Sequence, residues 1–255
     1  MILGEPAPTQ ADLRFSIFGF PVRVHPFFWV LCIILIINSS NIDLKQLLIW
    51  TAVVFVSILI HELGHAFMVR YYGGRPWITL HAFGGLCSYQ PIHRGPLSNI
   101  LISIAGPSAG FLFLAIVLSG IHAAGFPVVF VYLFNFLPMP IVAVEFPSPE
   151  LNTLVWDLIY VNYFWGLLNL LPLYPLDGGQ ISRELFMLGN PQTGVVQSLW
   201  LSVFTGAIIA VLAITKLESI FMALMFGYLA YTSWATIQAY TGRGGYGGGP
   251  TRRGW

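Results

Sequence analysis

The sequence predicts an all-α polytopic membrane protein with six transmembrane helices and a short re-entrant β-hairpin after the second helix. Three observations predict this fold class: 56% of the 255 residues are hydrophobic, only 8% are charged, and the apolar residues gather in long stretches. Ordinary soluble domains carry about 25% charged residues. Because the net charge is only +1 and the arginines are scattered, the composition also argues against nucleic acid as a partner.

The apolar stretches are judged against the ~20 residues that a helix needs to cross a bilayer. They cover residues 27–37, 47–69, 97–118, 126–144, 154–171, 195–214 and 220–240. The fourth contains Pro127, Pro138 and Pro140, which disfavour a straight helix. We therefore expect residues 119–150 to form an outer excursion that can dip into the membrane as a partial re-entrant hairpin, although a crossing at 126–144 stays open.

The distribution of positive charge favours six crossings. If residues 126–144 do not cross, one face of the membrane holds nine arginines and the other holds two lysines, Lys45 and Lys216. The arginines are Arg14, Arg23, Arg70, Arg75, Arg94, Arg183, Arg243, Arg252 and Arg253. A seventh crossing would nearly remove this asymmetry. Because cytoplasmic loops are enriched in Lys and Arg, both termini are expected in the cytoplasm.

Three regions follow from this count. Residues 1–26 form a cytoplasmic or interfacial N-terminal segment, residues 27–240 form the intramembrane domain, and residues 241–255 form a Gly- and Arg-rich tail that is expected to be disordered. The first residues lack the basic region and apolar core of a signal peptide, so the first span is expected to direct insertion. Cys32 and Cys87 lie in apolar surroundings and are expected to be small buried structural side chains rather than parts of a disulfide framework.

The second stretch contains His61-Glu62-Leu63-Gly64-His65, which is a zinc-hydrolase signature. Residues four apart share a helix face, so both imidazoles can bind one zinc ion, while Glu62 lies within reach of a water at the metal. Alternatively, these are polar helix residues that pair with neighbours. However, three ionisable groups within five residues of a lipid-buried helix are costly and are rarely kept without a function.

A catalytic zinc needs a third protein ligand. No Asp or Glu occurs between Glu62 and Glu145, which excludes a thermolysin-like third ligand, and Met68 and Tyr71 exclude the metzincin pattern. Asp177 remains, because the stretch at 154–171 runs inward like the second one and ends near the same depth. Asp177 is also in a good turn sequence, and both roles are compatible at a broken helix end.

These residues resemble the paired signatures of the site-2 protease family of intramembrane zinc metalloproteases, HExxH and NxxPxxxxDG. His61–His65 carries the first signature and Asn169–Gly178 carries the second, both without departure. A looser GxxxG-like feature of the family is similar to Gly106–Gly110, although such spacing is typical of plain helix packing. Phe20–Pro26 resembles the N-terminus of bacterial members.

The resemblance implies that His61, His65 and Asp177 bind one zinc ion per chain and that Glu62 is the general base. The implied enzyme is a zinc metalloendopeptidase that cuts membrane-anchored proteins within or beside their span. In the family, the asparagine that corresponds to Asn169 is associated with hydrogen bonds to the substrate or within the active site. A structural hydrogen bond between two helices is an equally good interpretation of Asn169. The implied location is a bacterial plasma membrane. Because no segment suits a soluble PDZ or CBS domain, regulation is expected from the membrane core or a membrane partner.

The segment that follows the second stretch favours β structure. Residues 77–89 carry β-forming residues on both sides of Phe83-Gly84-Gly85, which predicts a hairpin that re-enters the membrane. The family is similar in carrying such an element, and its edge can bind substrate by strand addition, so Gly84 and Gly85 are predicted to contact substrate. A simple interfacial loop is the alternative. His25, His81, His93 and His122 lack ligand spacing and are expected in loops or interfaces.

Two other functions compete with the protease. A metal-binding transporter or channel would use the same buried His and Asp residues, because such residues also mark ion routes. Glu62 separates the two, since transport needs no carboxylate beside the first ligand whereas water activation does. An inactive family member that acts as a chaperone is the other rival, but every position needed for catalysis is filled.

Overall fold

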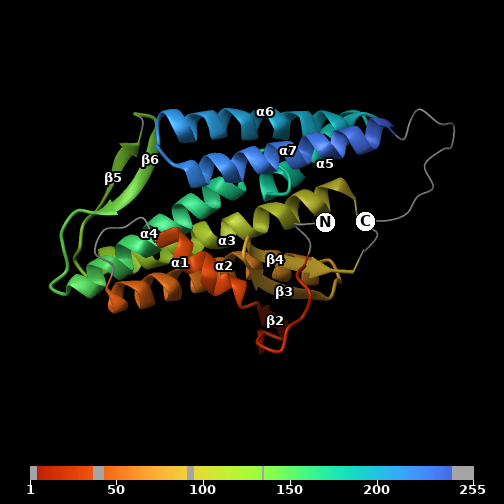
Figure 1. The fold of residues 1–255 in the computed structure, drawn as a ribbon. Helices are drawn as coiled ribbons and strands as arrows, with labels where there is room; N and C mark the ends of the chain where they lie inside the picture. The colour runs from red at the N-terminus through yellow and green to blue at the C-terminus, as the bar shows by residue number, and fades with distance from the viewer. Residues whose placement is uncertain (1–4, 37–42, 91–94, 134, 243–255) are drawn as a thin grey trace. The chain divides into compact units, whose positions relative to one another are not determined.

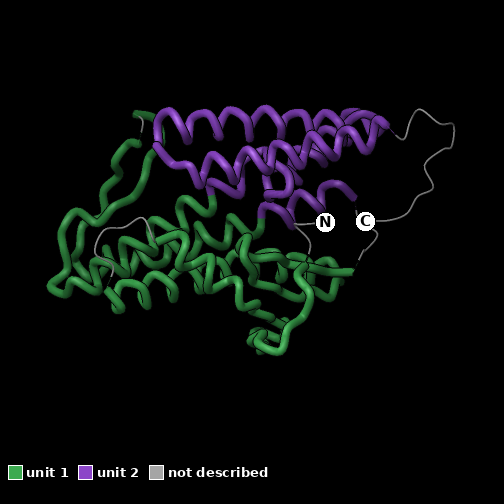
Figure 2. The backbone as a smooth tube through the Cα atoms, viewed as in Figure 1, with its two compact units in different colours: residues 1–90, 105–166 green, residues 91–104, 167–255 purple. Residues whose placement is uncertain are grey.

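The computed structural model describes residues 5–36, 43–90, 95–133 and 135–242 (Figure 1). The chain forms two compact units, one of residues 1–90 and 105–166 and one of residues 91–104 and 167–255 (Figure 2). The predicted tail at 241–255 lies outside the described residues except for its first two, Thr241 and Gly242, which end a helix.

The first unit contains the longest helices. Its helices are α1, Phe27–Ile36; α2, Leu44–Tyr71; most of α3, Pro96–Ala123; and most of α4, Pro149–Asn169. The carboxylate of Asp43 accepts a hydrogen bond from Gln46 N at 2.7 Å and so caps the start of α2. Trp50 of α2 donates its indole N–H to the Cys32 carbonyl of α1 at 3.0 Å. Together with their apolar contacts, this bond ties the two helices to each other.

A four-stranded sheet packs against α2, so the chain is mostly helical, as predicted, but contains more β structure than the single predicted hairpin. Its strands, in spatial order, are β1, Leu13–Ile17; β2, Phe20–Val24; β3, Pro76–His81; and β4, Gly84–Tyr89. The β-hairpin predicted at 77–89 is present as β3 and β4, with its turn at residues 82–83, whereas its re-entry into the membrane stays a prediction. The strands in the N-terminal segment were not predicted, because β2 forms hydrogen bonds with β3, parallel to it, across two intervening helices.

Apolar side chains of this sheet and of α1 and α2 form one core. Phe20, Val24 and Leu80 are buried completely or almost completely, as is Phe28 of α1. Arg70 at the end of α2 stacks over the Phe20 ring, 3.5 Å from its centroid, and donates to the Phe18 carbonyl at 2.9 Å. This cation–π contact fixes the β1–β2 turn to the last turn of α2.

The chain before β1 is fastened to the sheet by one carboxylate. Glu5 accepts hydrogen bonds from Thr79 Oγ1 at 2.7 Å, Arg23 Nη2 at 2.8 Å and Trp77 Nε1 at 3.1 Å. Partial burial raises the pKa of Glu5, but these three bonds hold it below its ordinary value of 4.5. The ionised carboxylate therefore links the N-terminal segment to β2 and β3.

The stretch at 126–144 forms a second, two-stranded sheet rather than a helix. Its strands are β5, Val128–Leu133, and β6, Leu137–Val142. In an antiparallel pair, hydrogen-bonded and non-hydrogen-bonded residue pairs alternate along the strands. Because Ala143 N donates to the Pro127 carbonyl, this alternation places Pro138 and Pro140 in pairs that make no hydrogen bonds to β5. Their missing N–H groups therefore face the outer edge of β6, where proline is tolerated.

The second unit contains three further helices, α5, Asp177–Gly189; α6, Gly194–Thr215; and α7, Ile220–Gly242. α6 and α7 run as neighbours and cross closely at Gly206, where an added Cβ would lie 3.0 Å from both the Phe226 carbonyl oxygen and the Ala230 Cβ. A glycine at this position lets the two apolar helices approach each other. The sequence did not predict α5.

Four helices of the described chain, α2, α3, α6 and α7, are long and apolar enough to cross a membrane, so the chain is an integral membrane protein. The two other predicted spans are weaker. The described α1 has 10 residues, or about 15 Å of helix, and α4 has 21 residues but carries Glu150 and Asp157. Six crossings thus remain a prediction.

The Glu5 contacts predict a stability that depends on pH. A carboxyl group whose pKa is lowered by folding stabilises the fold above its unfolded pKa, near 4.5, and loses this effect as the pH falls through its lowered folded pKa. Glu5→Gln is therefore expected to lower the melting temperature at pH 7, and the gap from wild type should close as the pH falls below 4.5. A Glu218→Gln variant, changed at an exposed position, is the control. A gap independent of pH would contradict the assigned role.

Candidate metal centre

One turn of α2 carries three buried ionisable side chains. His61, Glu62 and His65 are 3%, 4% and 7% exposed. The planes of the two imidazole rings are nearly perpendicular, at 78°, with the Nε2 atoms 3.2 Å apart and the ring centroids 4.9 Å apart. The i, i+4 spacing of a helix accounts for this arrangement, as the sequence predicted.

Glu62 lies against the backbone of β4. A Cβ added to Gly85 would overlap the Glu62 side chain, at 2.6 Å from its Cδ. A Cβ on the preceding Gly84 would lie 2.6 Å from the Trp165 indole, whose ring centroid is 6.4 Å from that of His61. The two glycines therefore let the β4 backbone contact the Glu62 side chain and the Trp165 ring, and a side chain at either position would displace the group that it meets.

Helix α3 approaches His65 from another direction. A Cβ added to Gly106 would overlap His65 Nε2 and would lie 2.7 Å from its Cδ2. On α2, a Cβ added to Gly64 would overlap the Ala105 carbonyl oxygen and would lie 2.7 Å from the Ala109 Cβ. α2 and α3 thus pack backbone against backbone beside the histidines.

Asp177 is the first residue of α5 and is 8% exposed. A helix N-terminus stabilises a carboxylate through its free N–H groups and its dipole. A Cβ on Gly178 or Gly179 would overlap the backbone of residues 170–174, which explains why two glycines follow Asp177. The same loop is fastened to α6, because Tyr174 N donates to Ser202 Oγ at 3.0 Å.

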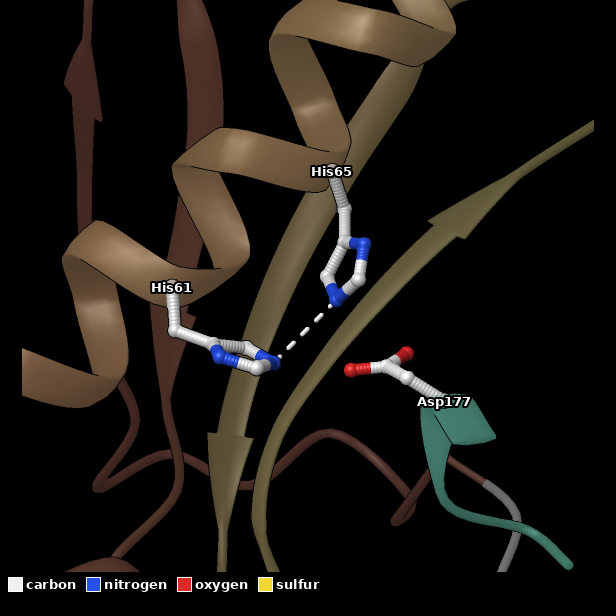
Figure 3. A group of neighbouring side chains, drawn as sticks. All are labelled: His61, His65 and Asp177. Atoms are coloured by element: carbon white, nitrogen blue, oxygen red, sulfur yellow. Dashed lines mark hydrogen bonds between the residues drawn. The ribbon is translucent and has the colours of Figure 1, made fainter. Parts of the chain in front are cut away.

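His61, His65 and Asp177 form a group of potential metal ligands (Figure 3). Each side chain offers one ligand atom, and these atoms all lie within 4.8 Å of one another. Two nitrogens on one tetrahedral zinc ion lie about 3.4 Å apart when each Zn–N bond is about 2.0–2.1 Å long, close to the observed 3.2 Å. Two imidazoles and one carboxylate are a common donor set for zinc, so this group can hold a zinc ion.

Other residues singled out in the sequence lie elsewhere. His25 and His81 are buried, and the Nδ1 atom of each accepts a hydrogen bond from a backbone N–H two residues later. Burial, followed by the charges of His25 and Arg23, lowers the pKa of His81. His122 lies in the last turn of α3, and His93 is outside the described residues. Among the described residues, Cys32 and Cys87 form no disulfide. Asn169 is 8% exposed and ends α4.

Two structural residues near the histidines escaped the sequence analysis. Trp165 contacts both Gly84 and the His61 ring, yet a tryptophan in an apolar helix is indistinguishable in sequence from a lipid-facing one. Asn162 of α4 is 2% exposed and donates to Ser57 Oγ of α2 at 2.9 Å, one turn before His61. A polar residue inside an apolar stretch was the available signal for Asn162.

The sequence matches the profile of peptidase family M50 over residues 49–212, more than half of the chain. A protein of Synechocystis sp., provisionally named a zinc metalloprotease, is 28% identical over 71% of this chain and 46% of its own length. A zinc metalloprotease of Methanocaldococcus jannaschii is 28% identical over 67% of this chain and 44% of its own length. The chain thus spans less than half the length of these relatives.

A solved structure has a similar fold. The site-2 protease from Methanocaldococcus jannaschii superposes with a TM-score of 0.55 at 24% identity, over 88% of this chain and 94% of that protein. The profile match includes both histidines, Asn169 and Asp177. From the profile match over most of its length, we conclude that this chain belongs to peptidase family M50, the site-2 protease family.

Proposed function

We propose that the protein is an intramembrane zinc endopeptidase that hydrolyses peptide bonds within or near the membrane span of membrane-anchored proteins. The observation that carries the proposal is the buried group of His61, His65 and Asp177, with Glu62 next to the first ligand. Zinc metalloprotease relatives support the reaction class. The lipid bilayer and a single-span protein substrate are the partners that the proposal requires.

His61, His65 and Asp177 would hold one zinc ion per chain. When bound at such a site, zinc acidifies a water molecule and polarises the carbonyl group that the water attacks. The burial of all three ligands excludes bulk water, which strengthens their electrostatic effect on a reacting group. The position of Asp177 at a helix N-terminus favours the ionised carboxylate that a metal ligand must supply.

Glu62 would act as the general base. Its carboxylate would take the proton of the attacking water and later return it to the leaving amine, which needs a single carboxyl group in a fixed position. Contact with Gly85 restricts that position. Asn169, at the end of α4 and eight residues before Asp177, would hydrogen-bond to the substrate or to the site.

The outer edge of β4 would bind the substrate in extended form. The Leu80 carbonyl accepts a hydrogen bond from His25 N, so the backbone N–H and C=O of Leu80 point toward β2 and not toward β4. Leu80 pairs with Gly85 across the β3–β4 ladder, and the N–H and C=O of Gly85 therefore point away from β3, toward the open edge of β4. A substrate strand added there would lie beside Glu62, which Gly85 contacts. Gly84 and Gly85 are the proposed substrate-binding residues, and the hairpin would re-enter the membrane at this place.

The finer topology also belongs to the proposal. Residues 27–240 would form the protease domain with six crossings, both termini would be cytoplasmic, and the location would be a bacterial plasma membrane. The nine-to-two division of basic residues supports the orientation. A regulatory membrane partner would control access to the site. A transporter or channel is not favoured, because the relatives are named as metalloproteases.

Glu62→Gln is expected to lower the cleavage rate by about 100- to 10,000-fold and to leave the zinc content unchanged, because it removes a general base and no metal ligand. The two forms would be expressed in one host, and membrane-anchored proteins that shorten only with the intact form would be identified. A Glu62→Gln protein that binds zinc and still cleaves these substrates would refute the protease assignment.

Asp177→Ala is expected to weaken zinc binding by more than about 100-fold, because it removes a ligand. Changing a residue that only hydrogen-bonds to a ligand costs about 10- to 100-fold. Asp157→Ala is the matched control, because Asp157 is also a carboxylate in the described chain but lies outside the ligand group. Zinc stoichiometry of the purified full chain is the measurement. Equal zinc retention in both variants would exclude Asp177 as a ligand.

The natural cysteine of β4 allows strand addition to be tested. Single cysteines placed along the span of an identified substrate are expected to form a disulfide with Cys87 of the Glu62→Gln protein at the position opposite Cys87 and more weakly two residues to either side, because side chains alternate along a strand. Cys87→Ser is the control for cross-linking elsewhere. Cross-linking with a period of three to four residues would instead indicate a bound helix.

A further inference from the structure

Gly106 of α3 contacts the metal-binding end of His65. A side chain at position 106 would overlap His65 Nε2, the atom that faces His61 Nε2 across 3.2 Å. Its Cβ would also lie 2.5 Å from His65 Cε1 and 2.7 Å from Cδ2, so the whole ring edge lies against the Gly106 backbone. The contact involves the ligand atom itself rather than an outer part of the side chain.

Packing of small residues does not account for this position. Gly106 and Gly110 are one turn apart on α3, both are buried, and both belong to the GxxxG-like element. A Cβ on Gly110 would meet only Asn162 Oδ1, at 3.8 Å, which is an ordinary contact. Glycine within a helix is less favourable than alanine, so Gly106 needs a specific reason, and the ordinary contact at Gly110 does not supply one. His65 supplies that reason.

The way in which the overlap can be relieved decides its effect. At Gly64 an added Cβ would meet the Ala105 backbone, which can move only if the helices separate. At Gly106 it would meet the far end of one side chain, which can turn about its χ angles. A side chain at position 106 would therefore leave the fold in place and move the imidazole away from His61.

We propose that Gly106 is a positioning residue for the metal centre: its lack of a side chain sets the orientation of the His65 imidazole in which Nε2 can share a zinc ion with His61. The inference rests on the proposed function in one respect, the identification of His65 as a zinc ligand. It adds α3 to α2 and α5, the two helices that carry the proposed ligands. Gly106 itself touches neither metal nor substrate in this role.

The test compares Gly106→Ala with Gly110→Ala in the full chain, purified in detergent. The two variants add the same methyl group to the same helix, one turn apart. Gly106→Ala is expected to raise the zinc dissociation constant by about 10- to 100-fold, the range for residues that orient a metal ligand, whereas Gly110→Ala should bind zinc like wild type. Equal affinity in the two variants would overturn the proposal.

Cobalt provides a spectroscopic measure of the same effect. The visible absorption of Co²⁺ reports its coordination geometry, so Gly106→Ala should give a changed or weakened band, and Gly110→Ala should reproduce the wild-type spectrum. An unchanged spectrum for Gly106→Ala would count against a role in orienting His65. A loss of general stability alone would not alter the band of the folded fraction.

A double-mutant cycle covers the case in which Gly106→Ala folds poorly. Removing the imidazole in His65→Ala opens the space that the new methyl group needs, so Gly106→Ala should lower the melting temperature of the metal-free wild type but not that of His65→Ala. A penalty that persists in His65→Ala would place the overlap elsewhere and refute the proposal. This cycle requires neither zinc nor protease activity, so it also separates a failure here from a failure of the proposed function.

Discussion

The central constraint on this fold is that one turn of an apolar helix must bury two imidazoles and a carboxylate. Each of these groups is costly to remove from water, and the proposed metal chemistry requires them close together. The neighbouring elements meet this constraint by approaching with bare backbone: β4 lies against Glu62 at Gly85, and α3 lies against His65 at Gly106. The side chains of Glu62 and His65 are thus confined by the backbone of two glycines, Gly85 and Gly106.

Asp177 is supported in a different way. Its position follows from a short helix start, two glycines that fold closely over the preceding loop, and the hydrogen bond between Tyr174 N and Ser202 Oγ. The histidines owe their spacing to the regular geometry of one long helix, whereas the carboxylate owes its position to irregular backbone. Irregular backbone within an apolar protein is tolerated only when its polar groups find partners, and Ser202 is one of them.

The sequence allowed prediction of those features that depend on local spacing. His61 and His65 had to share a face because the helix repeats every 3.6 residues, and β3 and β4 followed from residue preference on both sides of a turn. The pairing of Val22 with Ile78 could not be predicted, because nothing local joins strands separated by two helices. The sequence placed Gly106 in a GxxxG-like element but not beside His65, because a glycine in an apolar helix has the same pattern whether it packs against lipid, helix or imidazole.

The parallel pairing of β2 with β3 also restricts how the chain enters the bilayer. The two strands are direct hydrogen-bonded neighbours, although α1 and α2 lie between them in the chain. The polypeptide must therefore leave the level of β2 and come back to it, which means an even number of passages. If α2 traverses the lipid, a reverse passage has to precede it, which is the arrangement that six crossings predict.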